Sequence, residues 1–228
     1  MDEKINVLNV RINNIGAKEA MKEAIHYMRT ELVSVIEIVT ADILMKAGEL
    51  PRLKEDIEES ELVLAGEKTI LEAAGITEKK RLSELEPNWF LKMLMRYLHK
   101  NHVRIFLLSE DDTKLSEIKK YMQTNYAGIQ IAGEETITEG TSDDLILNLI
   151  NGAEAECVLA ALPSPLQERF ISRNRALINT RVWLGVGQGL ESASRTEAHS
   201  QKLRNFFARH LFRKEMEREK RRNCCSAE

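Results

Sequence analysis

The chain has 228 residues, of which 43% are hydrophobic and 30% are charged. These values indicate a folded protein with a sizeable core and argue against an intrinsically disordered chain. The net charge of −3 argues against a nucleic-acid-binding protein. Three cysteines, Cys157, Cys224 and Cys225, give no disulfide framework and fit a reducing compartment.

The first residues lack the basic and apolar regions of a signal peptide. No run approaches the roughly 18 apolar residues that are needed to span a bilayer. We therefore expect a cytoplasmic protein that contacts the inner face of the cell membrane, if at all, from its surface.

Apolar periodicity predicts strands and helices that alternate along the chain. The elements expected in the first half are a strand over 5–12, a helix over 17–31, a strand over 33–39, a helix over 43–59 that restarts at Pro51, a strand over 62–64 and a helix over 69–75. The second half adds helices over 91–99, 112–124, 143–151 and 167–177, and strands over 103–108, 129–133, 157–161 and 180–187.

The strands are short, apolar and β-branched, as expected of strands that are buried on both faces. Their alternation with helices predicts an α/β fold over residues 1–194, with a Rossmann-like, mostly parallel sheet and helices on both faces. Ligands of such folds bind at the carboxyl ends of the strands. The loops of interest are therefore 40–42, 65–67, 109–111, 163–165 and 185–189.

A basic tail forms the second predicted unit, over residues 195–228. Residues 195–222 contain ten Lys or Arg and four Glu, a charge of +6 that leaves −9 on the rest of the chain. We expect an amphipathic helix that binds an anionic membrane surface. Docking onto the body or a partner, and a solvated charged helix, are the alternatives. The residues expected on its apolar side are Leu203, Phe206, Phe207, His210, Leu211 and Phe212.

The most specific local pattern is a proline-stiffened turn, Pro163-Ser164-Pro165, between a strand and a helix. Gln167 and Glu168 fall in the first helical turn, where free N–H groups and the Gln167 amide suit a sugar or a phosphate. The alternative is N-terminal capping alone. Gly185 and Gly187 lack dinucleotide-fingerprint spacing, and they indicate either close ligand approach or a turn that needs positive φ. The histidines and cysteines form no metal-ligand pattern, so neither a metal nor another cofactor is expected.

This turn, with Gln167 and Glu168 after it, resembles the WecG/TagA/CpsF family of glycosyltransferases. The resemblance covers roughly residues 5–191. The segments that carry it are Val10–Asn14, Ile38–Asp42, Ala65–Glu67, Arg104–Leu108, Tyr126–Gly133, Pro163–Glu168 and Gly185–Gly187.

The resemblance implies a metal-independent, inverting transfer of a sugar of N-acetylmannosamine type, from a UDP donor to a lipid-diphosphate-linked acceptor, in cell-surface polysaccharide synthesis. It implies Glu67 or Asp42 as the catalytic base. The substrate contacts that it implies are Thr40, Ser164, Gln167, Glu168, Gly185, Gly187 and Gln188, with Arg204, Arg209 and Arg213 of the tail on the diphosphate. Self-association into a homo-oligomer is left open.

Two departures from the family pattern favour an alternative. Gly66-Glu67 stands where the family has Asp-Gly, and Ser109-Glu110-Asp111-Asp112 stands where it has Gly-Gly. Each carboxylate facing a diphosphate at about 4 Å would cost about 4 kcal/mol at an effective dielectric of about 20. The alternative is a catalytically degenerate member that binds a partner, a lipid-linked sugar or a nucleotide without turnover.

Overall fold

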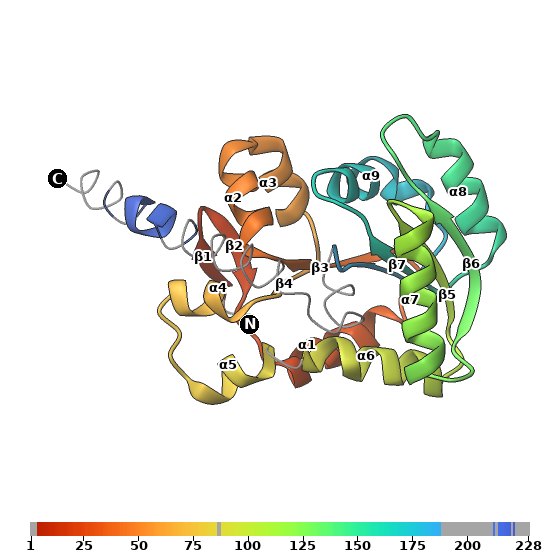
Figure 1. The fold of residues 1–228 in the computed structure, drawn as a ribbon, viewed down its shortest axis with the longest axis horizontal. Helices are drawn as coiled ribbons and strands as arrows, with labels where there is room; N and C mark the ends of the chain where they lie inside the picture. The colour runs from red at the N-terminus through yellow and green to blue at the C-terminus, as the bar shows by residue number, and fades with distance from the viewer. Residues whose placement is uncertain (1–3, 86–87, 188–211, 213, 220, 222–228) are drawn as a thin grey trace.

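The computed structural model describes residues 4–85, 88–187, 212, 214–219 and 221. A six-stranded parallel sheet lies between two layers of helices, which confirms the predicted α/β architecture (Figure 1). The strands are β3 (Ser34–Val39), β4 (Leu62–Ala65), β5 (Arg104–Ser109), β6 (Gln130–Thr136), β7 (Cys157–Ala161) and β8 (Val182–Gly185).

The strand order β4-β3-β8-β7-β5-β6 places the last strand in the middle of the sheet. Strand β8 pairs with β3 on one side and with β7 on the other, all in parallel. The loops that follow β3, β7 and β8 therefore meet at the centre of one sheet edge. Such a central meeting point is where open α/β sheets bind ligands.

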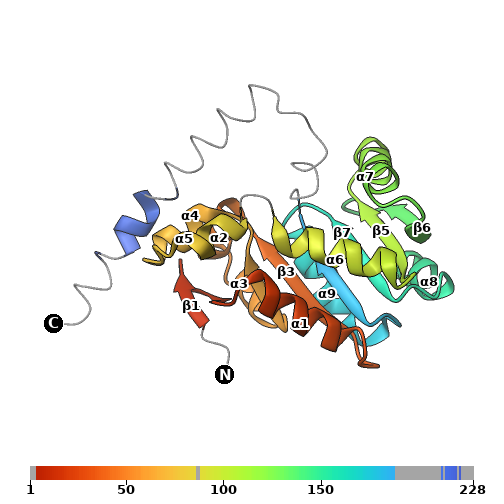
Figure 2. The same cartoon turned by 90° about the horizontal axis from the view of Figure 1, so that it is seen from below.

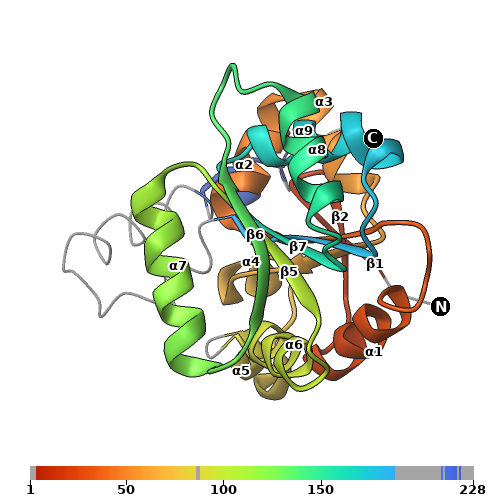
Figure 3. The ribbon, with the colours of Figure 1, turned by 90° about the vertical axis from the view of Figure 1, so that its right-hand side faces the viewer.

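Helices α1 (Ala17–Tyr27), α6 (Trp89–Lys100) and α7 (Asp112–Asn125) share a hydrophobic cluster with one sheet face. Figure 2 shows α1 and α6 side by side on this face. The other face carries α2 (Ala41–Glu49), α3 (Pro51–Glu58), α8 (Asp143–Gly152) and α9 (Leu166–Asn174). Figure 3, seen from the β6 edge, shows α8 and α9 on one side of the sheet and α6 on the other. Among the described residues, no helix combines the length and apolarity needed to cross a bilayer.

Helix α9 lies close to β8 because the Phe170 ring stacks on Trp183, with ring centroids 5.6 Å apart. Trp183 is completely buried, and burial of aromatic side chains makes a large contribution to core packing. This contact fixes where the first turn of α9 lies over the sheet. Strand β7 has the predicted bounds, and Cys157 at its start is buried, which raises the pKa of its thiol to about 12.

The prediction of a single strand over residues 5–12 is wrong. The segment forms a hairpin of β1 (Lys4–Val7) and β2 (Val10–Asn13), joined by Leu8 and Asn9 at φ values of 50° and 63°. Positive φ at both central residues produces a turn whose twist suits a two-residue hairpin. The hairpin lies beside β4, where the Asn13 side chain accepts a hydrogen bond of 3.0 Å from the Val63 amide. Helices α4 (Lys68–Ala73) and α5 (Lys79–Leu85) follow β4, and α5 was not predicted.

Part of the predicted tail packs on the body of the protein. Residues 214–219 are helical, and Phe212 and Met216 lie one helical turn apart with 0% and 7% exposure. Both belong to the hydrophobic cluster that contains Val7 and Leu8 of the hairpin. These two side chains therefore fit the docking alternative. The other apolar residues predicted for this helix lie outside the described residues.

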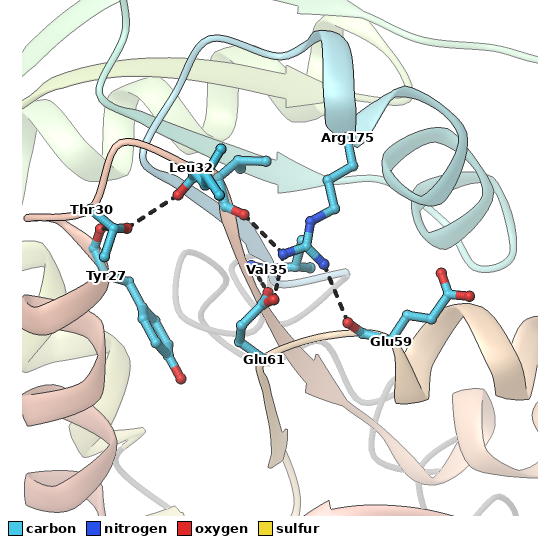
Figure 4. Close-up of polar contacts among 8 residues, drawn as sticks. Tyr27, Thr30, Leu32, Val35, Glu59, Glu61 and Arg175 are labelled. Atoms are coloured by element: carbon cyan, nitrogen blue, oxygen red, sulfur yellow. Dashed lines mark hydrogen bonds and ion pairs between the residues drawn. The ribbon is translucent and has the colours of Figure 1, made fainter.

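At the opposite, amino-terminal edge of the sheet, Arg175 forms an ion pair and hydrogen bonds that connect several elements (Figure 4). The Arg175 guanidinium follows α9 and donates to the Val33 carbonyl at 3.0 Å and to the Glu61 carboxylate. The second Glu61 oxygen accepts a 2.7 Å hydrogen bond from the Val35 amide. Arg175 and Glu61 thus tie the end of α9 to the starts of β3 and β4.

We expect Arg175→Ala to lower the free energy of unfolding by about 1–3 kcal/mol, because charge-assisted hydrogen bonds to partly buried groups are lost. Urea denaturation measures this change. Lys119→Ala is the matched control, since its ion pair with Glu134 has similar exposure, 34% and 36% against 35% and 30% for Arg175 and Glu61, but Lys119 donates to no backbone carbonyl in the described part of the chain. That control should cost less than about 1 kcal/mol. Equal losses of stability in the two variants would contradict a special stabilising role of the Arg175 contacts.

Candidate functional site

Three loops converge at the carboxyl edge of the central strands. Thr40 follows β3, the Pro163-Ser164-Pro165 turn follows β7, and Gly187 follows β8. A Cβ atom on Gly187 would lie 3.8 Å from the Ile43 side chain and 4.0 Å from the Leu162 carbonyl oxygen, so these loops approach one another closely. Gly187 has a φ of 49°, a conformation that favours glycine.

Thr40 and Asp42 lie at the start of α2. Thr40 is the N-cap, and its hydroxyl accepts a 3.4 Å hydrogen bond from the Ile43 amide. The Asp42 side chain is 61% exposed and forms a 2.9 Å ion pair with Lys46, one turn along the helix. The carboxylate of Asp42 is therefore accessible but already faces a cation.

Glu67 lies one strand away, after β4. Its neighbour Gly66 is held against β3 by a 2.8 Å hydrogen bond from its amide to the Val39 carbonyl. A Cβ atom at Gly66 would lie 3.0 Å from that same oxygen, so the close approach favours glycine. Glu67 is half-buried, and its carboxylate accepts a 3.2 Å hydrogen bond from the Thr69 hydroxyl. This carboxylate is thus held beside the edge by a neutral partner.

A buried polar pair lies directly beneath this edge. The Gln167 Nε2 donates a 2.8 Å hydrogen bond to the Glu37 Oε2, and the two residues are only 1% and 2% exposed. Glu37 is two residues before the end of β3 and opposite Gly185 in the register with β8. A Cβ atom on residue 185 would lie 2.0 Å from the Glu37 carboxylate and 2.4 Å from the Gln167 amide nitrogen. Only glycine leaves room for this pair.

Glu168 is a second buried carboxyl group, with 2% exposure. Burial raises its pKa, partly offset by hydrogen bonding to its backbone amide and to Ser164 and by the charge of Lys46. Burial also raises the pKa of Glu37 well above its ordinary value of 4.5, and the charge of Glu168 adds to that rise. Two neighbouring carboxyl groups in a low-dielectric interior favour retention of a proton.

The acidic loop after β5 has a structural explanation. Asp111 is the N-cap of α7 and accepts a 2.8 Å hydrogen bond from the Lys114 amide. Glu110 forms an ion pair with the Lys114 side chain, and Asp112 lies in the first helical turn. Carboxylates at a helix N-terminus stabilise the helix through its dipole. These groups therefore stabilise α7 whatever lies in front of them.

Two hollows flank the converging loops. One of about 40 Å³ lies on the α1 and α6 side, between Asn13, Ala65, Arg81 and Asn88 among others. A larger one of about 350 Å³ lies between the loop after β6 and α9, and it is lined by Arg169 and Arg173 together with Glu139 and Asp143.

The structure brings together Thr40, Ser164, Gln167, Gly185 and Gly187 around one edge, with Glu67 on the adjoining strand. Gln167 and Glu168 lie under the surface rather than on it. Gln188, Arg204, Arg209 and Arg213 lie outside the described residues. No cluster of metal-binding side chains occurs in the part of the chain that the structure describes.

Sequence reasoning missed Glu37. The available signal was a single acidic residue in the otherwise apolar and β-branched stretch of residues 33–39. An ionisable side chain in a strand buried on both faces needs a partner, and Gln167 supplies it from 130 residues away.

Comparison with known proteins identifies the family. The profile of the glycosyl transferase WecG/TagA/CpsF family matches residues 5–213, which is most of the chain. The chain belongs to this family. Its WecG/TagA/CpsF match covers all the loops described above.

A related protein is the N-acetylglucosaminyldiphosphoundecaprenol N-acetyl-beta-D-mannosaminyltransferase of Bacillus subtilis (strain 168), which is 25% identical over 164 residues. The match covers 71% of this chain and 63% of that protein, so the chain spans just under two thirds of the relative's length.

We expect Gly185→Ala to reduce stability by about 1–3 kcal/mol, because the added methyl group overpacks the buried pair and displaces it. Gly48→Ala is the matched control, since a Cβ atom at Gly48 meets no other atom within 4 Å. In the last turn of α2 it should leave stability unchanged or raise it by up to about 1 kcal/mol. Thermal unfolding of both variants checks this, and a Gly185→Ala variant as stable as the control would contradict the packing.

Glu37→Gln should become more stable relative to the wild type as the pH rises. The folded chain holds a proton on Glu37 at pH values where the unfolded chain has lost it, so wild-type stability falls from about pH 4.5 up through the raised pKa. Glutamine keeps the hydrogen-bond acceptor and does not ionise. Urea denaturation at pH 5 and pH 9 measures the difference, and a constant difference would show that Glu37 does not titrate abnormally.

Proposed function

We propose that this chain transfers a sugar of N-acetylmannosamine type from a UDP donor to a sugar carried on a lipid diphosphate. The observation that carries the proposal is the family match over residues 5–213, together with the loops that converge at one edge of its sheet. The name of the Bacillus relative describes an N-acetylmannosaminyl group placed on N-acetylglucosaminyl-diphospho-undecaprenol. We extend this substrate class to the present chain.

The proposed reaction is a direct displacement without a metal ion. A carboxylate takes the proton from an acceptor hydroxyl, and that oxygen forms a bond to the anomeric carbon of the donor sugar. The bond from this carbon to the diphosphate oxygen breaks, and UDP leaves with the electron pair. Attack opposite the leaving group inverts the anomeric configuration.

Glu67 is favoured over Asp42 as the base. Asp42 forms a 2.9 Å ion pair with Lys46 on its own helix, so its carboxylate is already engaged and is less free to meet an acceptor hydroxyl. The hydrogen-bond partner of Glu67 is the neutral Thr69 hydroxyl at 3.2 Å. No ion pair engages Glu67 within the described part of the chain, so its half-buried carboxylate is better placed to meet an acceptor hydroxyl.

Arginines are the proposed anchors of the diphosphates. Arg173 forms no ion pair within the described residues, and Arg169 reaches an 86%-exposed Glu139 only at 3.7 Å. Both line the larger hollow beside α9. Arg204, Arg209 and Arg213 of the tail complete the proposed set, and the tail's charge of +6 over residues 195–222 suits an anionic membrane surface. We infer peripheral association with the membrane on this basis.

The direct test of this function is transfer from UDP-N-acetylmannosamine to a short-chain lipid-diphosphate N-acetylglucosamine, followed by chromatography of the labelled acceptor. We expect product from the wild type and a loss of about 100-fold or more in kcat for Glu67→Gln, the usual range for a missing general base. Asp42→Asn is the matched control and should keep kcat within about threefold.

If the wild type forms no product with any UDP-sugar, the proposed transfer is refuted, even if the sugar nucleotide binds. Loss of activity in Asp42→Asn with full activity in Glu67→Gln would assign the base to Asp42 instead. Charge reversal at Arg204 and Arg209 tests the membrane contact, because sedimentation with anionic vesicles should fall while sedimentation with neutral vesicles stays low.

A further inference from the structure

The Glu37–Gln167 pair connects three elements at the proposed site. Glu37 belongs to β3, Gln167 begins α9, and Gly185 of β8 lies between them. Their 2.8 Å hydrogen bond joins residues 130 positions apart in the sequence. The side chain of Gln167 therefore has one end held by a partner outside its own helix.

The contact determines which end of the Gln167 amide is used. The Glu37 Oε2 accepts from the amide nitrogen, which an ionised carboxylate and the carbonyl oxygen of a protonated carboxyl can both do, so the amide oxygen is left over. That oxygen, Gln167 Oε1, is buried and has no hydrogen-bond partner in the described part of the chain. The Glu37 Oε1 is likewise buried without a hydrogen-bond partner among the described residues. Buried polar atoms of native proteins nearly always have partners, so a substrate or water group is expected to supply them.

The chemistry of the unpaired group restricts its ligand. An amide oxygen accepts from O–H and N–H groups, whereas an ionised phosphate offers acceptors alone. Gln167 oriented by Glu37 thus suits a sugar hydroxyl or an acetamido N–H and does not suit the diphosphate. Because Gln167 is only 1% exposed, a sugar reaches this oxygen only where the groups that cover it move aside.

We propose that Glu37 is a positioning residue, which holds the Gln167 amide so that its oxygen accepts a hydrogen bond from the sugar of the substrate. This inference rests on the proposed function. It assigns Glu37 a part in sugar selection, and it separates the Gln167 contact from the groups that bind the diphosphate.

The test compares the affinity for UDP with that for UDP-N-acetylmannosamine by calorimetry, in the full chain. The measured quantity is the ratio of the Kd for UDP to the Kd for UDP-N-acetylmannosamine. Glu37→Leu removes the hydrogen-bond acceptor, so this ratio should fall about tenfold while the Kd for UDP stays unchanged. Glu37→Gln keeps an acceptor oxygen of the same size and should restore the wild-type ratio. If the contact is to the acceptor sugar, the donor ratio stays constant and the KM of the lipid-linked acceptor rises in Glu37→Leu with kcat less affected.

Thr180→Val is the matched control. Thr180 is also buried, and its hydroxyl has no hydrogen-bond partner among the residues that the structure describes, but it precedes β8 at the opposite edge of the sheet. If Glu37→Leu does not fold, Gln167→Met removes the same amide and should give the same selective loss. Equal weakening of UDP and UDP-sugar, or no change in either sugar affinity, would overturn the inference. Absence of nucleotide binding and of transfer in the wild type would instead refute the proposed function.

Discussion

The hydrogen bond between Glu37 and Gln167 is the constraint on which the arrangement of the candidate site depends. It crosses β8 at Gly185, where any side chain would occupy the space of the two polar groups. Through this contact the end of β3 and the start of α9 take fixed positions relative to each other. The loops that carry Thr40 and Ser164 are continuous with those two elements. The buried hydrogen bond therefore determines the distance between the two loops.

The pair is costly to bury, and the surrounding structure compensates for the cost only in part. Desolvation and the charge of Glu168 both act against ionisation of Glu37, while Gln167 favours it. Several oxygens of this cluster have no partner among the described residues. Burying such polar groups without hydrogen-bond partners lowers the stability of the fold. A ligand that supplies the missing hydrogen bonds would bind with a corresponding gain, and the family assignment identifies sugars as the class to consider.

The alternation of elements was predictable because strands buried on both faces are short apolar runs and the helices between them are amphipathic. The order of the strands was not predictable, since nothing in the local pattern of residues 180–187 indicates that this strand lies between β3 and β7. The hairpin escaped prediction because Leu8 adopts a φ of 50°, which its side chain does not suggest. Gln167 and Glu168 were expected to contact the substrate, and their place in a first helical turn does not indicate that both side chains are buried. Packing of Phe170 on Trp183 turns that helix so that both side chains face inward.

Amide hydrogen exchange of the wild type, with and without saturating UDP-N-acetylmannosamine, tests most directly that this sheet edge is the substrate site. The account predicts slower exchange in residues 40–43, 164–169 and 185–187, the segments joined by the buried pair. Unchanged exchange in these segments, or protection confined to the opposite edge around Arg175 and Glu61, would contradict it.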